Sequence, residues 1–381
     1  MHDVGHAIAA ITIAVAVLGW EARLLESVTD RDLAIVLGVH DQVGSDAEHP
    51  DCLLALYPPA RSSSFSRSGS EAIEVETTNV AEFRLPPALL DALASIPLAG
   101  QPNPLSAEHH DWPIIDAVSE ATARRKLPDE AWPRPVPVAP PSTLHAPRSA
   151  SARQIIRQRR SAVDMDGVTS ISWETFHRIA ERLLPGQLPF TALPWKPSIH
   201  LAIFVHRVRD LTPGLYLLVR DPAERAVLQA EMNPDFVWQQ PESCPETLPL
   251  YLLQAGDHRQ TAQGVSCGQE IASDGAFAVG MIAEYAAPLE QHGPWFYRRL
   301  HWEAGVIGQM LYLEAEAAGV RGTGIGCFFD DSMHQVLGLP GYRTRSVDGP
   351  SIRYQTLYHF TVGGPIEDTR LRTAPAYGHR G

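Results

Sequence analysis

The chain has 381 residues, of which 44% are hydrophobic and 20% charged, and this composition is typical of a soluble globular protein with a sizeable core. Its formal net charge of −13 opposes attraction to phosphate backbones and anionic membranes, so we expect neither nucleic acid nor a membrane as a partner. The four cysteines show no CxxC pair and no zinc spacing, which indicates reduced thiols, no metal site and a cytoplasmic protein.

Residues 5–38 and 305–338 read as two copies of one segment, aligned without a gap at an offset of 300. In each copy a long apolar-faced helix ends at a glycine, an extended stretch follows, and a second short helix runs into Leu-Gly. The matched positions are Gly5 with Gly305, Ile11 with Leu311, Ile13 with Leu313, Gly19 with Gly319, Asp30 with Asp330, and Leu37-Gly38 with Leu337-Gly338. We therefore predict a duplicated fold.

A strand-like run follows each copy, at residues 53–57 and 356–362. About 150 residues before the second copy can complete a domain, whereas four precede the first. We expect residues 1–58 to be a truncated half unit that lacks its front half. The apolar run at 4–20 lacks the basic start of a signal sequence and is short for a membrane span. Because its counterpart carries Gln309, Glu314 and Glu316, we predict a buried helix.

Residues 59–150 change character and are predicted to connect the two units. Residues 62–70 are serine-rich, and residues 133–147 hold six prolines, which hinder helices and central strands. We interpret both tracts as linkers. Between them, residues 86–96 and 112–125 show short helical patterns, so part of the connector is expected to pack against its neighbours.

Residues 151–381 alternate helix and strand patterns and form the predicted complete domain. A basic helix at 153–161 precedes a helix at 172–184 with an apolar stripe. The later elements are predicted as strands at 199–208, 214–219 and 248–253, helices at 272–289 and 297–318, and strands at 322–328 and 355–362. The order predicts an α+β fold.

Three motifs of this domain suit an anionic ligand. Arg159-Arg160-Ser161 can hold a phosphate or a polar ring edge by forked hydrogen bonds, although such clusters are often a solvated face. The loop at 322–326 reads Gly-Thr-Gly-Ile-Gly, whose backbone a ligand can approach closely, but it departs from the dinucleotide fingerprint. Arg370-Leu371-Arg372 points both guanidiniums the same way if extended, and it equally fits an exposed tail.

The ordered set of motifs resembles the nitroreductase-like flavoproteins, and within them the azoline (thiazole/oxazole) dehydrogenases of the SagB type. The stretches that carry the resemblance are Arg159-Arg160-Ser161, Pro-Gly-Leu-Tyr ending at Tyr216, Glu303-Ala304-Gly305, Gln309-x-Leu-Tyr-Leu313, Gly-Thr-Gly-Ile-Gly-Cys-Phe-Phe-Asp-Asp331, Leu337-Gly338, Val362-Gly363-Gly364 and Arg370-x-Arg372. The resemblance implies a nitroreductase-like fold, a mixed antiparallel sheet flanked by helices, in a pseudo-dimeric duplication. In such proteins FMN lies in a dimer interface.

Carried onto this chain, the resemblance implies a set of FMN-binding residues. Arg159, Arg160 and Ser161 would contact the ring edge, ribityl chain or phosphate; Gly324, Gly326 and Cys327 would lie near the isoalloxazine; Arg370 and Arg372 would bind the phosphate. Hydride would pass through flavin N5, so no side-chain acid or base is required. The histidines have no partner at metal spacing.

The expected function is an FMN-dependent oxidoreductase acting on a small-molecule or peptide-derived substrate. One alternative is a non-catalytic scaffold or partner subunit of a biosynthetic complex with an eroded flavin site. A second is an NAD(P)H-dependent nitro- or quinone reductase. Gln291-His292 stands where azoline dehydrogenases carry Lys-Tyr, and the first copy lacks the glycine loop and the Arg-x-Arg tail. We expect either a pseudo-dimer, in which residues 1–58 supply the surface that a second subunit gives in homodimeric relatives, or a homodimer.

Overall fold

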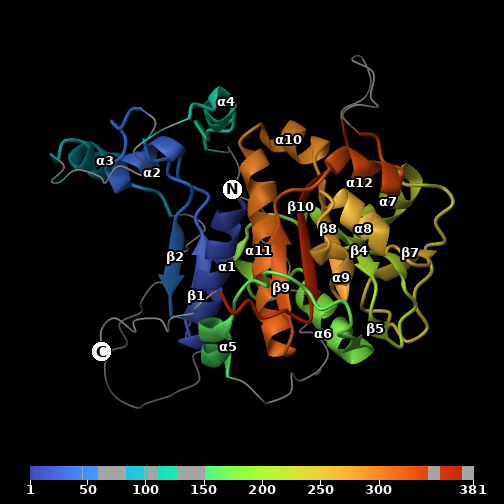
Figure 1. Ribbon diagram of the computed structural model, residues 1–381. Coiled ribbons are helices and arrows are strands. Elements are labelled where there is room, and N and C mark those ends of the chain that lie inside the picture. The colour runs from blue at the N-terminus through green and yellow to red at the C-terminus, as the bar shows by residue number, and fades with distance from the viewer. Residues whose placement is uncertain are drawn as a thin grey trace, which may run out of the picture.

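The structure is a computed structural model, and it describes residues 1–44, 46–58, 83–97, 100, 108, 110–127, 151–341 and 352–370. The two tracts predicted as linkers lie outside these ranges, as does Arg372. The predicted α+β class is confirmed, because helices pack on a six-stranded sheet (Figure 1). Every neighbouring pair in that sheet is antiparallel. No helix of the described ranges is long and apolar enough to cross a membrane.

The N-terminal part of the chain forms a small helix and strand unit. Its elements are α1 (His2–Val17), β1 (Glu21–Leu24), α2 (Asp30–Leu37), β2 (Leu54–Tyr57), α3 (Pro87–Ala94) and α4 (Pro113–Ala121). The side chain of Thr29 accepts the N–H of Asp32 and the Asp32 side chain accepts that of Thr29, so a capping box starts α2. Gly38 ends it in the left-handed region, with φ of 71°. β1 and β2 pair in an antiparallel two-stranded sheet.

The larger unit follows from residue 151. Its elements are α5 (Ala152–Gln158), β3 (Ile171–Ser172), α6 (Trp173–Arg182), a 3-10 helix (Phe190–Ala192), β4 (Ile199–Val205), β5 (Val208–Arg209), β6 (Gly214–Leu218), a second 3-10 helix (Pro222–Glu224), α7 (Arg225–Glu231), β7 (Leu250–Ala255), α8 (Arg259–Val265), α9 (Ile271–Asp274), β8 (Phe277–Glu284), α10 (Ala286–His292), α11 (Phe296–Ala317), β9 (Arg321–Ile325), α12 (Asp330–Leu337) and β10 (Tyr354–Gly363). The large sheet has the order β7-β6-β4-β8-β10-β9.

Both faces of the large sheet are buried. Along β4, Leu201 and Ile203 face the core beneath α11, α6 and α1, whereas Ala202 and Phe204 face a second core beneath α7, α8 and α12. Successive strand residues point to opposite faces, so a strand covered on both sides must be apolar throughout. α11 packs on one face of the sheet, and α1 runs beside α11 on the side away from the sheet (Figure 1).

The predicted helix at 272–289 is wrong. Residues 277–284 form β8, which pairs with β4 on one side and β10 on the other, and helices remain on its flanks as α9 and α10. A central strand buried on both faces has no polar alternation, so its apolar run cannot be told from a buried helix by periodicity.

The elements of the first unit recur in the second at the offset seen in the sequence. Residues 2–17 of α1 correspond to 302–317 of α11, β1 to the first four residues of β9, and α2 to α12. Gly19 and Gly319 both have φ of 75°. Glu21 pairs with Tyr57 and Arg321 with Gly363, so β2 takes the place of the last four residues of β10.

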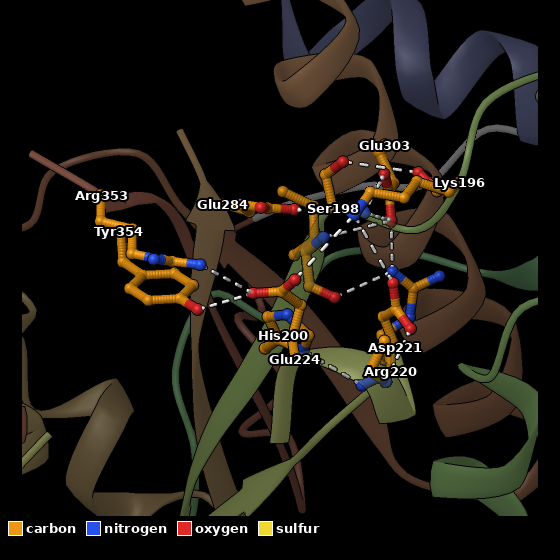
Figure 2. A network of polar contacts seen from close by, with 12 residues as sticks. Lys196, Ser198, His200, Arg220, Asp221, Glu224, Glu284, Glu303, Arg353 and Tyr354 are labelled. Atoms are coloured by element: carbon orange, nitrogen blue, oxygen red, sulfur yellow. Dashed lines mark hydrogen bonds and ion pairs between the residues drawn. The ribbon is translucent and has the colours of Figure 1, made fainter. Parts of the chain in front are cut away.

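A buried ion pair anchors the middle of α11. Glu303 and Arg220 are each 1% exposed, and the Glu303 carboxylate also accepts the N–H of Ser198 at 3.1 Å and the indole N–H of Trp195 at 3.3 Å (Figure 2). Arg220 donates to the carbonyl of Ile199 at 3.0 Å. The pair thus joins α11 to the start of β4 and to the segment after β6.

A second part of the network surrounds Lys196. Its ammonium lies 3.3 Å from Glu284, 3.8 Å from Asp221 and 4.0 Å from Glu224 (Figure 2). Tyr354 donates its hydroxyl to Glu224 at 2.9 Å. Burial raises the pKa of Glu284 and Lys196 opposes that shift. Because each carboxylate has a cation partner, we assign this network a structural role.

Replacing Glu303 by alanine is expected to lower the free energy of unfolding by about 3–5 kcal/mol, because Arg220 would remain buried without its partner. Urea unfolding followed by circular dichroism measures this. Glu120→Ala is the matched control, since its pair with Arg125 is 77% and 69% exposed, and it should change stability by no more than about 1 kcal/mol. Equal effects of the two substitutions would contradict the assignment.

Candidate functional site

Segments far apart in the sequence meet at the C-terminal half of α11. The Tyr312 hydroxyl accepts the N–H of Gly324 at 3.0 Å and lies 2.9 Å from the Ser161 hydroxyl. The Arg159 guanidinium lies over the Tyr312 ring, 4.8 Å from its centre. Ser161 forms a β-bridge with Gly322, which holds it against β9. We call Arg159, Ser161, Tyr312 and Gly324 the Tyr312 cluster; it unites three residues that the sequence assigned to one site.

The N-terminal helix α1 adds two histidines beside this cluster. His6 Nδ1 lies 3.1 Å from Gln309 Oε1, and Gln309 is nearly one helical turn from Tyr312. His6 Nε2 lies 3.3 Å from the Tyr358 hydroxyl, and the His2 ring stacks on the Tyr358 ring at 4.3 Å. We call His2, His6, Gln309 and Tyr358 the α1 histidine cluster.

Burial keeps these groups uncharged around neutral pH. It lowers the pKa of His2 to about 3, with His301 as the next cause. It also lowers the pKa of His6, which the hydrogen bond to Gln309 opposes. The pKa of Tyr358 is raised by burial. A neutral imidazole and a neutral phenol can share a hydrogen bond in either direction, so the pair can hold or pass a proton.

Two of the glycines in the predicted loop make room for side chains of β10. A Cβ on Gly322 would lie 2.6 Å from the Phe360 ring, and one on Gly324 would overlap the Tyr358 hydroxyl. The N–H of Gly324 is already donated to Tyr312. Close packing within the protein therefore requires both glycines.

The open part of the loop lies just beyond β9. A Cβ on Gly326 would meet no atom within 4 Å, and the neighbouring Cys327 is exposed. A ligand can approach the backbone at this end of the loop. Gly326 follows Gly324 of the Tyr312 cluster by two residues in the sequence.

The remaining predicted ligands point elsewhere or are not described. Arg160 turns its guanidinium to the carbonyls of Arg157 and Arg159 at the end of α5, at 3.2 and 2.7 Å. Arg370 is 87% exposed and pairs with Asp368 at 2.8 Å. Arg372 lies outside the described residues. The structure thus brings Arg159, Ser161 and Gly324 together without joining Arg160 or Arg370 to them by a hydrogen bond.

The counterpart of Gly326 at the offset of 300 is Glu26, and this position is filled. The Glu26 side chain is 8% exposed and pairs with Arg124 at 2.6 Å and with Arg299 at 3.2 Å. The Arg124 guanidinium lies 4.2 Å from the centre of the Trp295 ring, and that of Arg299 lies 3.9 Å from Trp302. Ion pairs and indoles therefore surround Glu26, whereas a Cβ on Gly326 would meet no atom within 4 Å.

A cavity of about 900 Å³ opens next to Trp295, between α4 and the start of α11. Its polar lining includes Arg125, Lys126, Gln291 and His292. The Gln291-His292 pair thus borders a cavity at the other end of α11 from the Tyr312 cluster. No group of three or more His, Cys, Asp or Glu side chains in the described ranges could hold a metal ion.

The sequence did not identify five residues of the site: His2, His6, Gln309, Tyr312 and Tyr358. Spacing offered a partial signal, because His2 and His6 are four apart on one helix and Gln309 and Tyr312 are three apart on another. Nothing in the sequence showed that the two helices face each other at these positions.

No protein-family model matches this chain, and no curated protein matches it. Among solved structures, a nitroreductase-type protein from Anabaena variabilis matches with a TM-score of 0.59 and 17% identity, over 96% of this chain and 64% of that one. This chain therefore spans less than two thirds of that structure. The match shows that the chain has the nitroreductase fold.

Two further structures match more weakly. A nitroreductase-type protein from Ralstonia eutropha has a TM-score of 0.37 and 13% identity, over 64% of this chain and all of that one. The E. coli microcin synthetase complex has a TM-score of 0.38 and 13% identity, over 74% of this chain and 83% of that one.

Buried neutral histidines make stability depend on pH. Burial lowers the pKa of His200 to about 3 and of His206 to about 4, besides that of His2. These groups bind protons mainly in the unfolded chain. The free energy of unfolding should therefore be highest above about pH 6.5 and should fall as the pH drops toward 4. Buried Glu284 and Glu314, whose pKa is raised, oppose the fall below about pH 5.

Urea unfolding at intervals from pH 8 to pH 4 tests this dependence. His2→Phe keeps a ring against Tyr358 and removes one titrating group, so its stability should fall less steeply between pH 6.5 and pH 5. A wild-type stability that is flat over this range would show that the histidines are protonated in the fold.

Proposed function

We propose that the chain is an FMN-dependent oxidoreductase that transfers hydride through flavin N5 to or from a small-molecule or peptide-derived substrate. The observation that carries this proposal is the meeting of Arg159, Ser161 and Gly324 at the Tyr312 side chain, on a nitroreductase fold. More specifically, the enzyme would be a dehydrogenase of the SagB type. If it instead works as a nitro- or quinone reductase, NAD(P)H would be its electron donor.

The residues present fit an anionic cofactor. Arg159 makes no ion pair with any described residue, so its charge is available to a phosphate. The Ser161 hydroxyl lies beside it, and the buried Nε2 of His2 has no hydrogen-bond partner in the described part of the chain. Arg370 and Arg372 remain predicted phosphate ligands.

FMN, when bound, supplies the hydride chemistry. The chain's own residues bind and orient: Arg159 provides positive charge, and the Tyr312 hydroxyl fixes both Ser161 and the N–H of Gly324. His6 and Tyr358 hold a proton between Nε2 and the phenol oxygen. The aromatic and imidazole rings of α1 and β10 exclude water from this side of the cluster.

We further infer that α1 and α11 are related by a pseudo-two-fold axis, so that the first unit stands in for a second subunit. A Cβ on Gly5 would overlap the carbonyl oxygen of residue 302, and a Cβ on Gly305 would overlap that of residue 2. Such a reciprocal contact is the signature of an isologous interface. Because Glu26 and its arginines fill the counterpart position, this arrangement leaves one cofactor site for each chain.

A scaffold with an eroded flavin site is the second candidate function. The ion pairs of Glu26 with Arg124 and Arg299, at the position matching Gly326, favour this candidate. The Gln291-His292 pair, in place of Lys-Tyr, also favours it. Flavin binding separates the two candidates.

Purified protein is expected to show absorbance bands near about 370 and 450 nm, or to gain them on addition of FMN. Arg159→Ala should weaken FMN binding by roughly 10- to 150-fold, because a charge-assisted hydrogen bond is worth about 1.5–3 kcal/mol. Arg160→Ala, whose guanidinium faces the α5 carbonyls, is the control and should have a smaller effect. Protein that stays colourless with excess FMN would support the scaffold.

Replacing Gly305 by alanine is expected to lower the free energy of unfolding by about 1–3 kcal/mol or more, because the new methyl group meets backbone of α1 that cannot move aside. Gly264→Ala, within α8 and with no atom within 4 Å of its Cβ, is the control and should be neutral or stabilising. Thermal unfolding measures both. A Gly305→Ala variant as stable as the control would contradict a close contact between α1 and α11 at this position.

A further inference from the structure

We propose that Cys267 and Cys327 form a redox-active dithiol that a low-molecular-weight disulfide, such as glutathione disulfide, converts reversibly to an intramolecular disulfide. Cys267 lies between α8 and α9, and Cys327 follows β9. The two are far apart in the sequence and belong to no CxxC motif. The fold alone brings them together.

Two hydrogen bonds to backbone carbonyls join the segment between α8 and α9 to the segment that follows β9. The N–H of Phe329 donates to the carbonyl of Val265 at 2.8 Å. The side-chain amide of Gln269 donates to the carbonyl of Cys327 at 3.0 Å. Val265 and Gln269 each lie two residues from Cys267, so the hydrogen bonds bracket that residue on both sides.

A third link runs through His359 of β10. Its ring stacks on Phe328 at 4.6 Å, and its Nδ1 lies 3.2 Å from the hydroxyl of Ser266. Phe328 and Ser266 are the immediate neighbours of Cys327 and Cys267. Three independent contacts from adjoining residues therefore hold the two cysteine side chains on facing loops.

The two thiols are neighbours on the facing loops and are accessible. The nearby Cys327 thiol is the main cause that raises the pKa of Cys267. Cys327 is exposed and Cys267 partly exposed, and both are reduced. Cys267 adopts the left-handed region with φ of 60°, which is uncommon for a residue with a side chain. An exposed thiol with a second thiol on the facing loop is the arrangement needed for an attacking and a resolving cysteine.

The chemistry balances as two thiol–disulfide exchanges. The Cys327 thiolate attacks one sulfur of glutathione disulfide, so that a mixed disulfide forms and one glutathione thiol leaves. The Cys267 thiolate then attacks the Cys327 sulfur and releases the second glutathione thiol. The protein loses two electrons and two protons, which appear in two molecules of glutathione. Excess glutathione reverses both steps.

The other two cysteines provide an internal control. Burial raises the pKa of Cys52 to about 11, and it also raises the pKa of Cys244, whose thiol donates to the carbonyl of Leu248 at 3.4 Å. Burial restricts the access of glutathione disulfide to these two thiols and also lowers their thiolate fraction, so both should exchange slowly. Oxidation should be confined to the Cys267–Cys327 pair.

The full chain, stripped of flavin, is incubated with glutathione and glutathione disulfide, acid-quenched, alkylated under denaturing conditions and digested for mass spectrometry. We expect free thiols to fall from four to two, with a peptide that links Cys267 to Cys327 and full alkylation of Cys52 and Cys244. Full alkylation of Cys267 and Cys327, or glutathione attached to each separately, would overturn the proposal.

Single substitutions test the order of attack. Cys267→Ser should accumulate glutathione on Cys327, because no resolving thiol remains, whereas the wild type should not. Ser273→Ala, on α9, changes no thiol; it is the control and should form the linked peptide as the wild type does. A linked peptide that joins Cys327 to Cys52 or Cys244 would sink the assignment. The readout needs no flavin, so its result is independent of whether the chain binds FMN.

Discussion

The contact of α1 with α11 at Gly5 and Gly305 sets the position of most other features. Two helices approach to backbone contact only where neither carries a Cβ, and here each glycine faces the carbonyl of the other helix. That approach brings His2 and His6 to Tyr358 and Gln309. It also leaves α11 between α1 and the large sheet (Figure 1), so that Gln309 contacts α1 while Tyr312 contacts β9.

The two ends of α11 differ in how charge is satisfied. Near its start, Glu26 is held between Arg124 and Arg299, and all three side chains are buried. In its middle, Glu303 and Arg220 neutralise each other. Near its end, Arg159 lies on the Tyr312 ring without a carboxylate among the described residues. A buried charge must be paired to be tolerated, whereas a charge at an open edge can await a ligand, so the two ends suit structure and binding respectively.

Several elements could be predicted from local pattern and others could not. The long apolar helix, α6 and the strands β4, β6 and β10 follow from periodicity over consecutive residues. β8 could not be recognised, because burial on both faces removes the alternation that marks a strand. In the site, Arg159, Ser161 and Gly324 were identified together, but the direction of Arg160 depends on carbonyls at the end of α5 that only the folded chain presents.

The sequence by itself determined the fold class, the repeat of residues 5–38 at 305–338, and the arginine and glycine motifs, because these depend on residue type and spacing along the chain. Only the tertiary structure decided that the Tyr312 hydroxyl contacts Ser161 and Gly324, and that Glu26, at the position matching Gly326, pairs with Arg124. It also decided that the loops of Cys267 and Cys327 face each other. These pairs join residues distant in sequence, and their contact depends on how helices and strands pack, which no local pattern records.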